Sequence, residues 1–339
     1  MPAGTLRPSR SISIARRPLT TNISTVARRS PCNSYLKIDA LPHVSAPSLL
    51  LPYSQVRHSS HSPPDATHNG RKKVTLQTIR NLYRKGEPIT MLTAHDFPSA
   101  HAAEIAGIEI VLVGDSLGMV AMGLEDTTEM VLDEMILHCR SVSRGAKSAF
   151  IVGDLPMGSF EISPEQAVGS ALRLMKEGRV HGVKIEGGEE LGPTIKRITQ
   201  VGIPVVGHGK TVKSATKILR DALVMQEAGV SMFVLEALPP EVATLITKKL
   251  SVPTIGIGAG NGCSGQVLVQ IDMTGNFQPG RFVPKFAKQY ADVWGEATRG
   301  ITQYREEVKS RAFPSPEYTY PVSQEELAKI EKAFSEFQE

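Results

Sequence analysis

The chain has 339 residues, of which 41% are hydrophobic and 21% charged, and its formal net charge is +4. This composition is ordinary for a soluble globular enzyme, and the length allows one large domain plus a tail. No apolar run approaches the ~20 residues that a membrane helix needs, so we expect no membrane partner. The three cysteines have neither metal-binding nor redox spacing, which favours free thiols in a reducing compartment.

The positive charge belongs to the beginning of the chain. Residues 1–70 hold eight basic and two acidic side chains, so the rest of the chain has a net charge of −2. A chain without an excess of positive charge cannot neutralise phosphates, so we expect no nucleic-acid partner. Residues 1–70 are rich in Arg and Ser and lack the apolar core of a secretory signal, which favours a disordered mitochondrial presequence removed near residues 57–60. A disordered basic tail or a chloroplast address remains open.

From residue 72 onward, short apolar runs alternate with amphipathic segments. Thr75 is expected to cap a helix that ends before Gly86, and further helices are predicted at 163–176, 214–227 and 240–250. The runs between them are rich in Val, Ile and Leu and do not alternate with polar residues, which indicates strands buried on both faces of a parallel sheet. The eight expected strands are 89–95, 110–115, 149–154, 182–186, 204–208, 232–236, 253–257 and 266–271.

Eight strands with interposed helices predict an α/β chain that folds as a (β/α)8 TIM barrel, preceded by an N-terminal helix. The rival is an open, doubly wound sheet, and the eighth unit is the least secure part of the prediction. We expect a disordered leader at 1–70, the catalytic barrel at 71–312, and an irregular C-terminal segment with a helix at 313–339, in which Ser323 and Glu326 form a capping box.

Most of the expected strands end in an ionisable residue. Such a residue is often a simple turn or cap, but the carboxyl ends of barrel strands meet at one mouth. Carboxylates gathered there repel one another unless a cation intervenes, and hard oxygen ligands favour Mg²⁺ over zinc. The residues at these strand ends are Asp96, Asp115, Asp154, Lys184, Glu186, His208 and Glu236.

A glycine-rich run, 256–265, follows the seventh expected strand. Such a loop can bind an anion through its backbone N–H groups, or it can form a tight turn that packs closely against its neighbours. The run lacks the P-loop lysine and does not match the dinucleotide pattern, so both interpretations stay open.

Seven segments resemble those of the ketopantoate hydroxymethyltransferase family, and they occur in that family's order. They are 113–119 (VGDSLGM), 153–156 (GDLP), 183–188 (VKIEGG), 206–208 (VGH), 235–236 (LE), 256–261 (GIGAGN) and 283–286 (VPKF). The resemblance implies a (β/α)8 barrel, a homo-oligomer (a decamer in expectation) and Mg²⁺. It also implies transfer of a hydroxymethyl group from the co-substrate 5,10-methylenetetrahydrofolate to 3-methyl-2-oxobutanoate, which gives 2-dehydropantoate for pantothenate synthesis.

The resemblance also implies roles for single residues. Asp115 and Asp154 would bind the metal, and with it the oxo acid, while Glu186 would be a ligand or lie just outside the ligands. Ser116 and Lys184 would hold the oxo acid, and Glu236 would be the base. These types suit the reaction, because a cation and an ammonium group stabilise an enolate and a carboxylate can accept the carbon-bound proton.

Some roles stay open. Ser116 also fits an ordinary hydroxyl bonded to backbone. His95 and His208 fit either a ligand-orienting or a structural role.

The chain departs from the family pattern after its fifth expected strand. A segment that the family carries there is absent, and Gly209 runs directly into Lys210. We therefore keep two alternatives to an active transferase. One is a catalytically impaired barrel that acts as an assembly partner. The other, which is weaker, is an Mg²⁺-dependent lyase that breaks or forms C–C bonds in oxo acids without folate.

Overall fold

A computed structural model describes residues 70–209 and 215–336. The predicted presequence up to residue 69 and the connection 210–214 lie outside the described residues, as do 337–339. Among the residues described, no helix is both long enough and apolar enough to cross a membrane.

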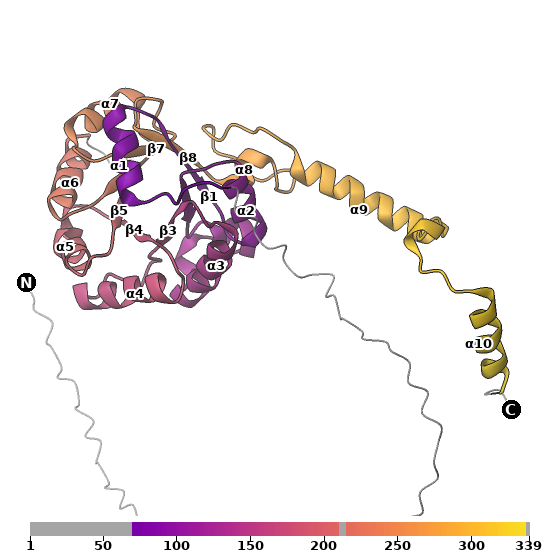
Figure 1. Cartoon of the computed structure of the whole chain (residues 1–339). Coiled ribbons are helices and arrows are strands. Elements are labelled where there is room, and N and C mark those ends of the chain that lie inside the picture. Colours follow the sequence, from indigo (N-terminus) through magenta and orange to yellow (C-terminus); the bar gives the residue numbers. More distant parts are fainter. Residues whose placement is uncertain (1–69, 210–214, 337–339) are drawn as a thin grey trace, which may run out of the picture. The chain divides into compact units, whose positions relative to one another are not determined.

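Eight parallel strands close into a barrel in sequence order, with helices around its outside (Figure 1). The predicted barrel is therefore confirmed, and the open doubly wound sheet is wrong. The strands are β1 (Ile89–Thr93), β2 (Ile110–Val113), β3 (Phe150–Asp154), β4 (Gly182–Glu186), β5 (Val205–Gly209), β6 (Met232–Glu236), β7 (Thr254–Ile257) and β8 (Gly265–Leu268). Because all of them run in the same direction, their carboxyl ends lie at one mouth.

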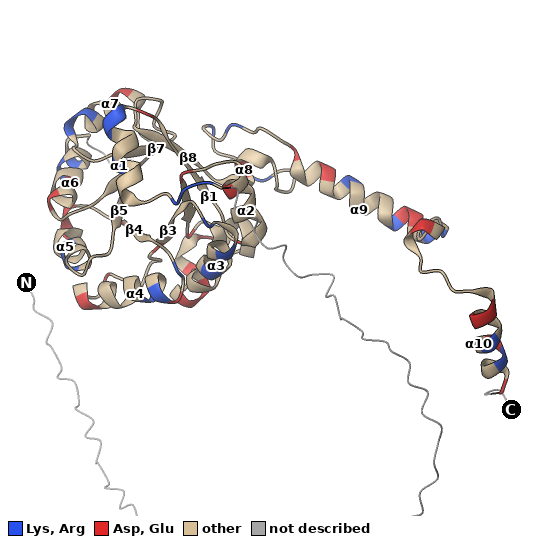
Figure 2. Ribbon diagram, viewed as in Figure 1, with Lys and Arg blue, Asp and Glu red and all other residues tan. Residues whose placement is uncertain are grey.

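Helices connect most of the strands and cover the barrel. They are α1 (Leu76–Lys85), α2 (Phe97–Ile105), α3 (Leu132–Gly145), α4 (Pro164–Lys176), α5 (Gly192–Gln200), α6 (Ala215–Glu227), α7 (Pro240–Lys249) and α8 (Gln270–Thr274). Short helical turns lie at η1 (Gly118–Met122), η2 (Thr127–Glu129) and η3 (Glu189–Leu191). Figure 2 shows basic and acidic residues side by side on the outer helices. Among them, Arg173 of α4 pairs with Asp133 of α3 and with Glu177.

Local sequence explains where these helices begin and end. The Thr75 side chain accepts the backbone N–H of Thr78 at the start of α1, and Gly86 ends that helix at φ 71°, a left-handed conformation that glycine adopts without a Cβ clash. Asp96 and Ser163 cap α2 and α4 in the same way. Asp96, one of the ionisable residues at the strand ends, thus accepts the Ser99 N–H with one carboxylate oxygen at the start of α2.

The apolar core has two layers. One fills the inside of the barrel with alternate strand residues such as Ile110, Val152, Val206 and Val234. The other lies between the strands and the surrounding helices and includes Phe233. Side chains two residues apart on a strand face the same side, so those that come two residues after the last inner one, nearer the carboxyl end, face the mouth.

The last part of the chain differs from the prediction. The eighth strand ends at Leu268 rather than at residue 271, because the Gln270 N–H donates to Thr93 Oγ1 and its side-chain amide donates to the Ser99 carbonyl as α8 begins. The helix α9 (Val293–Ser310) was not predicted, whereas α10 (Gln324–Glu336) follows the expected Ser323 cap. A short turn, η4 (Pro316–Tyr318), lies between them. No residue of α9 or of α10 is buried in the described part of this single chain.

Candidate active site

An ion pair between β3 and β4 lies at the bottom of the barrel mouth. The Lys184 ammonium donates to Asp154 Oδ2 at 2.9 Å, and both side chains are almost fully buried, with exposed fractions of 6% and 3%. Burial by itself lowers the pKa of Lys184, but the negative charges of Asp154, Asp115 and Glu186 outweigh it and raise the pKa above the ordinary value. Lys184 is therefore a permanent positive charge among carboxylates.

Asp115 and Ser116 come to the same place from the end of β2. The backbone N–H of Asp115 donates to Asp154 Oδ2 at 3.0 Å, which fixes the turn after β2 against β3. A Cβ added to Gly114 would lie 3.3 Å from Ser116 Oγ and 3.6 Å from Asp154 Oδ2, so the two oxygens flank this glycine. The absence of a side chain at Gly114 thus leaves space at the mouth beside Asp154.

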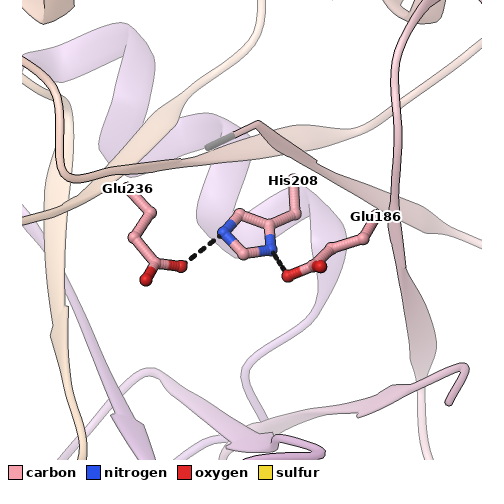
Figure 3. A group of neighbouring side chains, drawn as sticks. All are labelled: Glu186, His208 and Glu236. Carbon is pink, nitrogen blue, oxygen red and sulfur yellow. Dashed lines mark ion pairs between the residues drawn. The ribbon is translucent and has the colours of Figure 1, made fainter. Parts of the chain in front are cut away.

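Glu186, His208 and Glu236 form a row across the ends of β4, β5 and β6 (Figure 3). Glu186 Oε1 contacts His208 Nδ1, and Glu236 Oε2 lies 2.8 Å from His208 Nε2. Nε2 makes no hydrogen bond to a described residue, so this second contact is an ion pair without an aligned hydrogen bond. The Lys184 ammonium is 3.5 Å from His208 Nδ1, which connects this row to the ion pair with Asp154.

The chain turns sharply after both glutamates. Gly187 has φ 156°, and Ala237 has φ 54°, a left-handed conformation that costs a non-glycine residue about 1–2 kcal/mol. The Ala237 N–H donates to the Ile257 carbonyl at 2.9 Å, which ties this turn to β7. Backbone held in this way fixes the position from which Glu236 enters the mouth.

The residues at the ends of β2 and β3 fit a hard divalent cation. Asp154 Oδ1 is buried and has no hydrogen-bond partner among the described residues, although Oδ2 of the same carboxylate has two. An uncompensated buried carboxylate oxygen is costly, and a cation ligated by oxygens of Asp154 and Asp115 would compensate it. That Asp115 and Asp154 bind a cation stays a prediction, which this unpartnered oxygen and the oxygen chemistry of the residues support.

A second set of possible ligands is Glu186, His208 and Glu236, whose nearest ligand atoms lie within 4.8 Å of one another. Figure 3 shows the two carboxylates on opposite nitrogens of the ring. These atoms are close enough to one another to surround one cation, so the row is a second candidate ligand set. The same ring also contacts one carboxylate at each of its nitrogens.

A cavity of about 350 Å³ lies outside the row, next to β5 and α6. Its apolar lining includes Ile218, Met225 and Phe233, and it reaches Glu186 and His208. The helix α6 is connected to η3, because its Asp221 side chain accepts the Glu189 N–H at 3.2 Å. The same carboxylate pairs with Lys217 one turn earlier in α6. The barrel is therefore closed on this side despite the short connection that follows Gly209.

The glycine-rich loop after β7 packs closely against its neighbours. A Cβ at Gly258 would come within 2.5 Å of the Phe286 ring, and one at Gly260 within 2.5 Å of Pro240. These contacts favour the tight-turn interpretation of the loop. Of the cysteines, Cys139 is free and buried, and burial raises the pKa of its thiol, as expected for an inert side chain.

Comparison with known proteins places the chain in a family. The model of the family described as ketopantoate hydroxymethyltransferase matches residues 73–208 and 209–316, which together are more than half of the chain. The chain belongs to the ketopantoate hydroxymethyltransferase family. The resemblance inferred from the seven segments is thereby confirmed.

Relatives with known names agree. The 3-methyl-2-oxobutanoate hydroxymethyltransferase of Emericella nidulans is 65% identical over 302 residues, which cover 84% of this chain and 86% of that protein. The mitochondrial enzyme 1 of that name from Arabidopsis thaliana is 43% identical over 300 residues, covering 80% of this chain and 86% of that protein. Among solved structures, 2,3-dimethylmalate lyase has a TM-score of 0.51 at 14% identity, covering 78% of this chain and 96% of the lyase, which shows the fold alone.

The same comparisons bear on the segment expected to be absent. The family match is divided between His208 and Gly209. The Emericella alignment spans 302 positions but only 84% of 339 residues, about 285, so about 17 of its positions have no residue in this chain. The family match therefore breaks at the place where the sequence departs from the pattern.

All six predicted site residues gather at the mouth, where short distances connect Asp115 to Glu236 and Ser116 lies beside Gly114. His208 is the residue whose place in this row the sequence left open, since a structural role fitted it equally well. Its position at the end of β5, between strands that end in Glu186 and Glu236, was the available signal.

Proposed function

We propose that this chain transfers a hydroxymethyl group from 5,10-methylenetetrahydrofolate to 3-methyl-2-oxobutanoate, giving 2-dehydropantoate and tetrahydrofolate in pantothenate biosynthesis. The observation that carries the proposal is the 65% identity to the Emericella enzyme of that name, in a chain whose predicted site residues meet at one mouth. In the overall reaction a C3–H bond breaks, a C3–CH₂ bond forms, and water supplies the new hydroxyl group.

The roles that we propose are those that the family resemblance implies, and the geometry supports them. Asp115 and Asp154 would hold Mg²⁺, with Glu186 as a further ligand or just outside the ligands, and the ion would act as a Lewis acid toward the ketone and carboxylate of the oxo acid. Lys184 supplies a positive charge where the enolate oxygen develops, and Ser116 donates a hydrogen bond to the oxo acid. Glu236, which is 30% exposed at the end of β6, takes the proton from C3.

The activity is tested by incubating the purified chain with both substrates and Mg²⁺ and following 2-dehydropantoate by NMR. We expect product only when the folate and the cation are both present. Absence of product at high protein concentration would favour the impaired barrel, an alternative supported by the break in the family match at His208. Turnover of the oxo acid without folate would instead favour the lyase.

We also propose a mitochondrial location. The names of the Arabidopsis relative and of a rice relative, which is 47% identical and covers 73% of this chain and 67% of its own length, include the word mitochondrial. Residues 1–69 lie outside the described residues, so their basic, Ser-rich composition is the support from this chain. A fluorescent protein fused behind residues 1–70 should enter mitochondria, and a chloroplast or cytosolic signal would contradict the proposal.

We also propose that the chain forms a homo-oligomer, which the family resemblance leads us to expect as a decamer, and that α9 is part of the interface. Trp294, Ile301, Tyr304 and Val308 share one side of this helix and are exposed in the single chain. Replacing Ile301 with Glu should lower the mass seen by light scattering, whereas Gln303→Glu, on the opposite side, should not. Equal masses for the two variants and the wild type would exclude α9 from the interface.

A further inference from the structure

The row of Glu186, His208 and Glu236 contains an arrangement that the assigned roles leave unexplained. We propose that His208 is a positioning residue, which holds the Glu236 carboxylate where it takes the proton and keeps it apart from the carboxylates that would bind the cation. This inference rests on the proposed function, because it concerns the base of that reaction.

The position of His208 is set more firmly than that of either glutamate. Its side chain is 5% exposed, against 39% for Glu186 and 30% for Glu236. The β5 backbone beside it packs directly on the outer core, because a Cβ added to Gly207 would come within 2.6 Å of the Phe233 ring. The imidazole is thus a rigid group between two longer and more exposed side chains, and a rigid group can restrict the rotamers of a flexible one.

The direction of the ring decides which carboxylate meets which nitrogen. Nδ1 points toward Glu186 and lies 3.5 Å from the Lys184 ammonium, so this side belongs to the charged cluster around Asp154. Nε2 points the other way, toward Glu236. Each nitrogen of the ring therefore contacts one carboxylate, with Glu186 on the side of the charged cluster and Glu236 on the other.

Separation of this kind has a chemical reason. A glutamate has several rotatable bonds, and one at the rim of a cation site would be drawn toward the positive charge. A carboxylate that ligates a cation is a poor base, because its lone pairs are engaged. The 2.8 Å between Nε2 and Glu236 Oε2 is already within hydrogen-bond distance, and catalytic hydrogen bonds that are poorly aligned without substrate often tighten when substrate binds.

Two amide substitutions separate the two sides of the ring. The side-chain amide of Gln in His208→Gln places a donor near the position of Nε2, whereas that of Asn in His208→Asn places one near Nδ1. His208→Leu supplies neither. Each variant is compared with the full-length wild-type chain in three measurements: steady-state turnover, folate-free exchange of the C3 proton in D₂O, and Mn²⁺ affinity by EPR as a probe of the cation site. Thermal melting checks that each variant is folded.

We expect His208→Gln to keep both rates within about tenfold of wild type, and His208→Asn and His208→Leu to lose about 100-fold, the scale of a misplaced catalytic group. The KM for the oxo acid and the Mn²⁺ affinity should stay within about threefold in the two amide variants, because the cation site on Asp115 and Asp154 is untouched.

Other outcomes contradict the positioning role. A higher rate for the Asn variant than for the Gln variant would mean that the ring acts through Glu186 rather than through Glu236. Equal rates for the two variants would mean that the ring does not position Glu236. Loss of Mn²⁺ binding in all three variants would make His208 a ligand instead. A wild-type chain that neither exchanges the C3 proton nor makes product would contradict the proposed function and this role with it, whereas an active wild type with unaffected variants would contradict the role alone.

Discussion

At the scale of single residues, Asp154 connects the turn after β2 to β4. Its Oδ2 accepts both the Lys184 ammonium and the Asp115 N–H, while its buried Oδ1 has no hydrogen-bond partner among the residues described. One carboxylate thus positions β2 and β4 with one oxygen and leaves the other for a ligand. Within the described part of the chain, the buried carboxylate, which is 3% exposed, is therefore held by donors on one oxygen only.

Replacing Asp154 with Asn tests this division. The amide removes the charge from the cation site, so we expect the Mn²⁺ affinity measured by EPR to fall by at least about 10- to 100-fold. Ser116→Ala is the matched control at the same mouth, because it should raise the KM for the oxo acid while leaving Mn²⁺ affinity unchanged. Wild-type Mn²⁺ affinity in Asp154→Asn would place the cation elsewhere.

At the scale of the elements, a buried carboxylate outside the site holds α2 against the start of β3. Glu104 is 6% exposed, and its two oxygens accept the N–H groups of Ser148 and Ala149 at 2.8 and 3.1 Å. Burial raises the pKa of Glu104, but these hydrogen bonds outweigh burial and lower the pKa below the ordinary value. The carboxylate therefore stays charged where it compensates two backbone donors.

Replacing Glu104 with Ala leaves both N–H groups without an acceptor. We expect a loss of about 2–4 kcal/mol in the free energy of unfolding, measured with denaturant. The Glu104→Gln variant, which keeps one acceptor oxygen, should lose less. Equal stability of the Ala variant and wild type would mean that other groups satisfy these donors.

A histidine at the entrance of β4 gives the fold a dependence on pH. The Ile151 N–H donates to His181 Nδ1 at 2.8 Å, and burial, with the nearby charge of Lys73, lowers the pKa of His181 to about 4. The unfolded chain takes up this proton near pH 6.5 while the folded chain resists it, so stability is full above that pH and falls as the pH drops toward 4.

The His181→Asn variant keeps an acceptor oxygen near Nδ1 but cannot titrate. Its melting temperature should therefore fall less steeply than that of wild type between pH 6.5 and 4. Parallel curves would show that His181 is not responsible for the acid sensitivity.

The sequence predicted which strands and helices form better than it predicted where they end and which side chains contact one another. The eight strands were predicted because runs of Val, Ile and Leu fit a barrel interior, and strand direction then predicted that Asp115, Asp154, Lys184, Glu186 and Glu236 meet. The end of β8 depends on distant contacts, since Thr93 and Ser99 accept from Gln270. The orientation of the His208 ring could not be predicted, because strand order does not tell which ring nitrogen faces which carboxylate.

At the scale of the whole molecule, the short connection after β5 is the feature that sets this chain apart from its family. The barrel closes without the missing segment, and α6 is fastened through Asp221, but a cavity of about 350 Å³ reaches His208. A shorter connection supplies less chain to cover the mouth, and water that enters there would weaken the electrostatic contacts that the site depends on. The account thus predicts an active but impaired enzyme.

Inserting the segment of the Emericella relative between Gly209 and Lys210 tests this prediction. We expect kcat/KM to rise by about tenfold or more as water is excluded from the mouth. A Gly-Ser insert of equal length is the control and should give no gain. An unchanged kcat/KM with the native segment would show that the short connection is compatible with full activity.

The central claim is that side chains from separate strands meet at one rim to remove a proton from an oxo acid. The most direct measurement is NMR exchange of the C3 proton of 3-methyl-2-oxobutanoate in D₂O, without folate and with Mg²⁺, for wild type and Glu236→Gln. The account predicts exchange that EDTA abolishes and that the Gln variant slows by about 10²- to 10⁴-fold. Exchange at the wild-type rate in Glu236→Gln, or exchange that EDTA leaves unchanged, would contradict it.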